Sequence, residues 1–409
     1  SGKMSDEDYR EGFLEVFTRA VEARLRAPND TIGSMLSGGM DSGTVVAVAK
    51  ELLAAAGRGP LPTYSCTVQS DSSHPEIEEI RSIAAAITMP AISPTVIESR
   101  SLADHVDAMI GGNEEPFDGE CMLLKAIYRA AAIDNRRVIL DGVAGDVVLG
   151  EGSYVFRLLR GGHLVRAARE IRGECRYWNL KSCTNHFYRR IRSAAAPEFA
   201  RRLRKQSATA KADALVTKSL ISRSFARQVR LDERVQRNRL MFPGTWSRDY
   251  ASERCEAIRP NLTGGQERYA RLAAAAGVEA SDPFMDKRVV DYCSSLPGRL
   301  RQRDGWPKAI LRDLTEGRLP DEVRRARGKH HVGWVFNAAV TESAARAGKV
   351  TSHRLERSLG EYISSEKLLN AWAKLEAGED AEPIHSALVL AAWLRENETR
   401  PVVTRGPKG

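Results

Sequence analysis

The sequence has little of what marks secreted, membrane-spanning or zinc-binding proteins. Its 409 residues include only six cysteines, scattered without a C-x-x-C pair, and its eight histidines show no H-E-x-x-H or similar spacing. We therefore expect reduced thiols and no zinc site. No apolar run reaches the ~20 residues of a membrane span and no signal peptide is recognisable, so we expect a cytoplasmic protein without a membrane partner.

The composition that is present is typical of a soluble globular protein, with 42% hydrophobic and 28% charged residues. The net charge of +9 is concentrated in residues 157–172, 189–218 and 318–329. A basic surface of this kind can hold nucleic acid, an acidic peptide or polyphosphate. Aromatic residues near these runs are few, so a nucleic-acid partner is not expected. A solvated helical face is the alternative interpretation.

Strand-like and helical patterns alternate through the first 157 residues. One apolar run ends near Leu36, and three others cover residues 62–68, 91–97 and 137–140. Helical patterns cover residues 40–56, 72–86, 101–110 and 122–133. The alternation predicts an α/β fold with a parallel, doubly wound sheet. Strand signals disappear after about residue 158, which predicts large helical additions. We divide the chain into an α/β core (1–157), a basic helical insertion (158–248), a second helical part (249–397) and a tail (398–409).

A glycine-bearing turn, Ser37–Ser42 (SGGMDS), follows the first strand and opens a helix. Such a turn directs backbone N–H groups and a helix N-terminus at one point, which favours anions. Ser37 and Ser42 add hydroxyl groups, and Asp41 adds a carboxylate for a Mg²⁺ that bridges phosphates. The turn lacks the Lys-Ser/Thr ending of a Walker loop and the spacing of G-x-G-x-x-G. We interpret this first glycine loop as a pyrophosphate-binding loop; an ordinary capped turn is the alternative.

A second glycine loop, Asp141–Asp146, directly follows the strand at 137–140. Ligands of parallel sheets bind at the carboxyl ends of the strands, so both glycine loops are expected to face one pocket. Residues 66–68 at the end of the second strand are candidates for packing on an adenine ring. An acidic turn at 114–118 could hold a substrate or an incoming amine, or could simply be solvated.

Several motifs together carry a family resemblance. The first glycine loop resembles the SGGxDS loop of the PP-loop ATP pyrophosphatases, which have a HUP-like, adenine nucleotide alpha hydrolase-like fold. From about residue 5 to 395, the chain is similar to the synthetase domain of glutamine-dependent asparagine synthetases and their relatives. This wider resemblance rests on the two loops and on Asp282–Asp286, Lys308–Arg312 and Leu319–Val323.

Some details look most like asparagine-synthase-related proteins such as lasso peptide cyclases. These details are Leu140-Asp141-Gly142, Asp304-Gly305-Trp306 and Gly328-Lys329. Cyclases of that kind adenylate an Asp or Glu side chain of a precursor peptide, whose N-terminal amine then closes a macrolactam ring.

The resemblance implies ATP and Mg²⁺ as cofactors and a role for each matching residue. Asp41 and Asp146 would bind Mg²⁺, and Lys308 would neutralise charge on the α-phosphate or the tetrahedral intermediate. Asp141 and Glu115 are further catalytic candidates. The residues expected to contact ATP or its pyrophosphate are Leu36, Ser37, Gly38, Gly39, Asp41, Ser42, Val68, Asp141, Gly142, Lys308 and Arg312.

The sequence departs from the family at Val143, where asparagine synthetases have an acid that assists proton removal from the attacking nitrogen. The proton acceptor is then one of Asp141, Glu115, Asp118 and Glu151, or the amine arrives neutral. A Cys-led glutaminase domain is also absent, and we leave open whether one precedes Ser1 in the natural protein.

We therefore expect an ATP-dependent carboxylate–amine ligase that forms an acyl-adenylate, AMP and pyrophosphate. Macrolactam closure of a lasso-type precursor peptide is favoured, with a leader-binding or protease partner. The alternatives are an asparagine synthetase that uses aspartate and ammonia, a non-catalytic nucleotide- or peptide-binding relative, and a nucleic-acid-modifying PP-loop enzyme.

Overall fold

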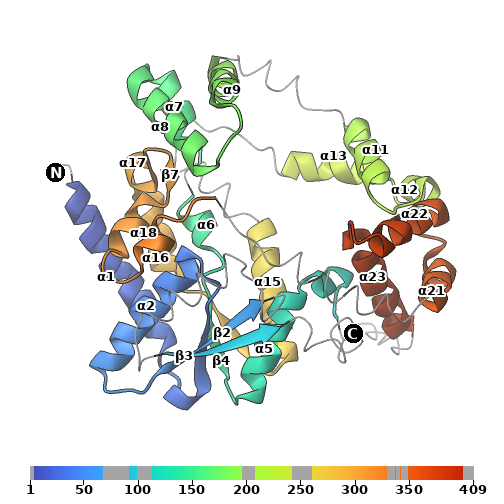
Figure 1. Ribbon diagram of the computed structural model, residues 1–409, viewed down its shortest axis with the longest axis horizontal. Coiled ribbons are helices and arrows are strands. Elements are labelled where there is room, and N and C mark those ends of the chain that lie inside the picture. The colour runs from blue at the N-terminus through green and yellow to red at the C-terminus, as the bar shows by residue number, and fades with distance from the viewer. Residues whose placement is uncertain are drawn as a thin grey trace, which may run out of the picture.

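The computed structural model describes residues 4–67, 92–98, 113–150, 152–195, 208–241, 260–328, 337, 341 and 349–398 (Figure 1). The helices expected at 72–86 and 101–110 lie outside these residues, as does Val68.

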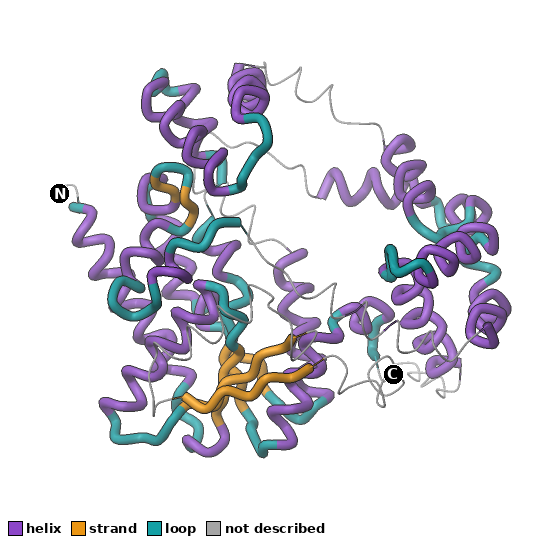
Figure 2. Tube along the Cα trace, viewed as in Figure 1, coloured by secondary structure: helices purple, strands orange, loops and turns teal. Residues whose placement is uncertain are grey.

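A five-stranded parallel sheet forms the centre of the fold and confirms the predicted α/β class (Figure 2). Its spatial order is β3-β2-β1-β4-β5. The strands are β1 (Ile32–Met35), β2 (Leu61–Thr67), β3 (Ile92–Glu98), β4 (Val138–Leu140) and β5 (Glu279–Ser281). β1 pairs with β2 on one side and with β4 on the other, so the chain switches direction across the sheet between β1 and β4.

Helices cover both faces of this sheet, as a doubly wound fold requires. The neighbouring residues Ile139 and Leu140 of β4 belong to two different apolar clusters, because successive strand side chains point to opposite faces. One face is covered by α1 (Asp6–Arg24), α2 (Met40–Ala55), α16 (Lys287–Ser295) and α18 (Ala309–Leu314). The other is covered by α5 (Met122–Ile133) and α15 (Pro260–Ala275).

Local sequence signals account for α1. Ser5 caps its N-terminus in a capping box with Asp8. Phe13, Phe17 and Val21 recur at four-residue spacing and are fully buried. This helix packs against α2, α16 and α18.

The helical additions form two groups in Figure 1. The first is α7 (Tyr154–Arg160), α8 (Leu164–Tyr177) and α9 (Cys183–Ala195). The second is α11 (Ala208–Lys218), α12 (Arg223–Gln228), α13 (Leu231–Met241), α21 (Lys349–Leu359), α22 (Ser365–Glu376) and α23 (Glu382–Glu398). The short elements are η1 (Asn29–Thr31), η3 (Pro116–Glu120), α6 (Gly145–Val148), η4 (Pro283–Met285), α17 (Gly298–Arg301) and α19 (Asp321–Arg324). Among the described residues, no helix is both long and apolar enough to cross a membrane.

The large helical additions predicted after residue 158 are confirmed, and short strands lie among them. These strands are β5 and an antiparallel hairpin of β6 (Gln302–Arg303) and β7 (Trp306–Pro307). Strands of two or three residues are too short to show an alternating pattern.

The expectation that the thiols are reduced is wrong for one pair of cysteines, since Cys175 and Cys183 form a disulfide between α8 and α9. The turn between these helices brings together two thiols that are separated by eight positions.

Candidate active site

The two glycine loops meet where the sheet changes direction, between β1 and β4. A Cβ atom at Gly142 would lie 2.6 Å from the backbone nitrogen of Ser42, and one at Gly145 would lie 2.6 Å from the carboxylate carbon of Asp41. Only glycine permits such a close approach. The crevice at this point of an open α/β sheet is the usual ligand site.

The first glycine loop is held in shape by its own serines. Gly38 adopts a positive φ of 80°. The Ser42 hydroxyl accepts a hydrogen bond from the Ser37 backbone nitrogen at 3.1 Å and lies 3.0 Å from the Ser37 hydroxyl. Gly39 precedes α2 without a side-chain cap. The loop and the first turn of α2 therefore present backbone donors at a helix N-terminus.

Lys308 lies between β7 and α18 and reaches both loops. Its ammonium group contacts the Asp41 carboxylate and lies 2.6 Å from Asp146 Oδ1. Lys308 is only 8% exposed. Burial by itself lowers the pKa of Lys308, but the charges of Asp41 and Asp146 outweigh it and raise the pKa above its usual value. One buried cation thus bridges carboxylates from two loops.

The β6–β7 hairpin, which directly precedes Lys308, contacts α8. Glu170 accepts a hydrogen bond from the Gly305 backbone nitrogen at 2.8 Å, and Glu174 accepts one from the Gln302 side chain at 3.2 Å. Gly173 of α8 and Gly305 of the hairpin are in close backbone contact. A Cβ atom at Gly173 would overlap the backbone of Asp304, and one at Gly305 would overlap the backbone of Gly173. The helical insertion therefore fixes the segment that precedes Lys308.

A buried arginine connects the same region to the second glycine loop. Arg301 is fully buried in α17 and donates to the carbonyl oxygens of Val148 at 3.1 Å and Gly150 at 3.4 Å. These carbonyls lie at and after the C-terminus of α6, where a positive charge is favourable.

One cavity of about 490 Å³ is lined by both loops. Of the residues proposed to contact ATP, pyrophosphate or metal, those that line it are Leu36, Ser37, Gly38, Gly39, Asp41, Ser42, Gly142, Asp146, Lys308 and Arg312. Arg312 is held there by hydrogen bonds to backbone carbonyls, including that of Pro307 at 2.9 Å, and its guanidinium lies 4.8 Å from the Trp306 ring centroid. The volume is in the range of small-molecule sites.

Asp41 and Asp146 are a donor pair suited to Mg²⁺. Among the described residues, no group of three or more His, Cys, Asp or Glu side chains is placed to hold a metal ion. Mg²⁺ is usually held by one or two carboxylates together with substrate phosphates. Two carboxylates beside the first glycine loop fit that ion.

Comparison with known proteins identifies the family of the chain. The profile of the asparagine synthase family matches residues 12–395. The chain belongs to this family. The chain is also similar to asparagine synthetase (glutamine-hydrolyzing) 3 of Bacillus subtilis (strain 168), with 36% identity over 62 residues. That match covers 15% of this chain and 10% of the relative's length.

In this asparagine synthase family member, three of the predicted site residues lie outside the cavity lining or the described residues. Asp141, the first residue of the second loop, is buried and accepts a hydrogen bond from the Val143 backbone nitrogen at 3.1 Å. Glu115 is largely exposed and lies 3.2 Å from Arg271, which also pairs with Asp118 at 2.9 Å. Val68 lies outside the described residues. Their proposed roles stay predictions.

Other cavity-lining side chains carry no sequence motif. They include Glu120, Cys121, Tyr177, Tyr269 and Asn337. The ring of Tyr269 comes from α15, and Tyr177 comes from the end of α8. Only the three-dimensional packing of the helical additions against the core identifies them.

Asp141, the buried first residue of the second loop, forms an acidic pair with Asp282, which is partly exposed. Burial, together with the charge of Asp141, raises the pKa of Asp282 to about 8. Within the described part of the chain, Asp282 Oδ2 has no hydrogen-bond partner. The two carboxyl groups therefore hold at least one proton near neutral pH.

This pair predicts that stability falls with rising pH. Between the ordinary carboxyl pKa of 3.8 and about 8, the folded protein binds more protons than the unfolded chain. The free energy of unfolding then decreases as pH rises through that range. Asp282→Asn mimics the protonated acid, so we expect its denaturant midpoint to vary less between pH 5 and about 8. A wild-type pH profile in the variant would contradict the assignment.

Proposed function

We propose that this protein is an ATP-dependent ligase that joins a carboxylate to an amine through an acyl-adenylate, releasing AMP and pyrophosphate. The observation that carries the proposal is the meeting of the two glycine loops and Lys308 in one cavity. Membership of the asparagine synthase family supports amide formation driven by ATP.

Each part of the cavity has a function in this reaction. The Ser37–Ser42 loop would bind the pyrophosphate through backbone N–H groups and serine hydroxyls. Asp41 and Asp146 would hold Mg²⁺, which supplies charge neutralisation to the phosphates when bound. Lys308 would then turn from these carboxylates toward the α-phosphate and the developing oxyanion, where a compact cation stabilises negative charge.

We propose that the substrate is a peptide and that the reaction closes a macrolactam, as in lasso-type cyclases. Val143 supports this choice, because it lines the cavity where asparagine synthetases have an acid. A precursor peptide and a leader-binding or protease partner would then accompany the enzyme. Asparagine synthesis from aspartate and ammonia is the competing function, supported by the named relative.

Pyrophosphate release, measured with ATP and Mg²⁺, tests the proposal. The carboxylates to compare are L-aspartate with ammonia and synthetic peptides that have a free N-terminal amine and one Asp or Glu side chain. Release with a peptide, together with loss of one water mass, supports macrolactam closure. Release with aspartate and ammonia, but with none of the peptides, supports asparagine synthesis. Absence of release and of nucleotide binding would refute the ligase.

The contact between α8 and the hairpin gives a further prediction. Glu170→Ala removes the acceptor of the Gly305 N–H, so Lys308 is less well positioned, and we expect kcat for pyrophosphate release to fall about 10–100-fold. ATP affinity should change little, because Glu170 does not line the cavity. Glu170→Gln retains an acceptor oxygen and should restore most of the rate. Equal kcat values in wild type and Glu170→Ala would disprove the positioning role.

A further inference from the structure

The helices α7–α9 carry charge of one sign on their surface. Residues 152–195 contain ten Arg or Lys residues and only two acids, Glu170 and Glu174. Both acids are buried, each at 4% exposure. Glu174 is surrounded by partners, with His186 at 2.8 Å, Arg190 at 2.9 Å and Gln302 at 3.2 Å. The surface presented to solvent by this group of helices is therefore basic, and it complements an acidic partner.

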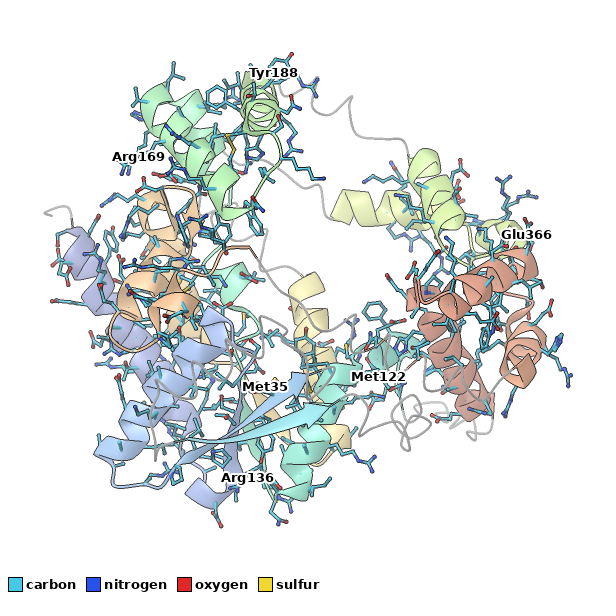
Figure 3. The ribbon with its side chains drawn as sticks, viewed as in Figure 1. Met35, Met122, Arg136, Arg169, Tyr188 and Glu366 are labelled. Carbon is cyan, nitrogen blue, oxygen red and sulfur yellow. A yellow bond between two sulfur atoms is a disulfide. The ribbon has the colours of Figure 1, made fainter. Side chains whose placement is uncertain are left out.

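Large apolar side chains are exposed within the same basic surface. On α9, Phe187, Tyr188 and Ile191 are 36%, 65% and 40% exposed. Phe187 and Ile191 are neighbours at four-residue spacing on the helix. Tyr188 lies at the outer part of α9 in Figure 3, with the Arg192 guanidinium 5.9 Å from its ring centroid. These three residues, with Arg189 and Arg192, are here called the α9 face. Clustered exposed aromatics of this kind mark interaction sites.

The turn between α8 and α9 connects this surface to the cavity. Trp178, 41% exposed, packs edge-on against Tyr177 with ring centroids 4.9 Å apart. Tyr177 lines the cavity and donates a hydrogen bond to the Gly328 carbonyl at 3.1 Å. The Cys175–Cys183 disulfide joins the two helices beside this turn. A chain that leaves the cavity past Tyr177 would therefore meet Trp178 and α9.

We propose that the α9 face is a docking surface for an acidic peptide with apolar or aromatic anchor residues. Aliphatic Ile191 favours a peptide, because nucleic acid would use the arginines and aromatics but not the aliphatic side chain. Among residues 152–195, no exposed acid is present to repel an acidic partner. Identification of this peptide as the enzyme's own substrate rests on the proposed function. The carboxylate to be activated would enter the cavity while the flanking segment binds α9.

Fluorescence anisotropy with a labelled peptide of alternating Glu and Leu residues tests the surface directly. The triple variant Phe187→Ser/Tyr188→Ser/Ile191→Ser changes only exposed side chains, and we expect it to weaken binding at least about tenfold. A Lys/Leu peptide should bind the wild type weakly, and added salt should weaken the Glu/Leu complex. Leu369→Ser is the matched control, because Leu369 is 54% exposed on α22, away from α9.

The outcomes separate the two proposals. Equal affinity of wild type and triple variant for the Glu/Leu peptide would overturn the docking surface. Displacement of the peptide by a single-stranded oligonucleotide that binds more tightly would also overturn it, in favour of a nucleic-acid site. The docking result does not depend on ATP turnover. If no carboxylate supports pyrophosphate release, the proposed function fails while the binding measurement still decides whether α9 binds acidic peptides.

Discussion

Lys308→Met is expected to lower the rate of pyrophosphate release and amide formation by about 10²–10³-fold, while ATP still binds. Lys308 is the cation in the cavity that bridges Asp41 and Asp146, so it is poised to stabilise charge when phosphates arrive. Methionine keeps the unbranched shape of lysine but removes its charge. It also has the same backbone preferences at this position, where φ is 58°.

Three measurements are made on this variant: steady-state pyrophosphate release, thermal unfolding and ATP binding. Lys287→Met, on the exposed surface of α16, is the control for the loss of one lysine. Full turnover in Lys308→Met would show that the cation is structural only. If both ATP binding and turnover are lost, Lys308 contributes to nucleotide affinity rather than to the chemical step.

Gly142→Ala is expected to separate the two glycine loops. The added Cβ would lie 2.6 Å from the Ser42 nitrogen and 2.8 Å from the Asp41 carbonyl carbon, and these backbone atoms cannot rotate away. Overpacking of this kind costs about 1–3 kcal/mol. We expect weaker ATP binding, by about tenfold or more, because both loops contribute to one site.

Isothermal titration with ATP and Mg²⁺ measures this effect. Gly264→Ala is the matched control, since an added Cβ there meets no atom within 4 Å on α15. Alanine is also a better helix former than glycine, so the control should be neutral or slightly stabilising. Wild-type affinity in Gly142→Ala would mean that the second loop does not shape the nucleotide site.

The sequence was sufficient to predict the parts that depend on local chemistry. The first strand, the Ser37–Ser42 loop and α2 follow one another as the local pattern predicts, and α5 has the bounds that its apolar spacing predicts, Met122–Ile133. The position of Lys308 beside Asp41 and Asp146 came from the family resemblance, because these residues are far apart in the chain.

Features that depend on long-range packing were not predictable. The three residues of β5 are a strand only because β4 lies beside them. The pairing of Glu115 and Asp118 with Arg271 joins η3 to α15, which no local pattern indicates. The burial of Asp141 next to Asp282 likewise depends on how η4 packs against the second loop. The one-sign charge of the α7–α9 surface could be recognised only after the two acids of α8 were found buried.

Isotope transfer from the carboxylate to AMP tests the central claim most directly. The protein would be incubated with ATP, Mg²⁺ and a peptide or amino acid whose side-chain carboxylate is labelled with ¹⁸O. An acyl-adenylate leaves one carboxylate oxygen on the phosphate when the amine displaces AMP. The account predicts AMP that carries one ¹⁸O and unlabelled pyrophosphate. Formation of ADP, or AMP without label during amide formation, would contradict it.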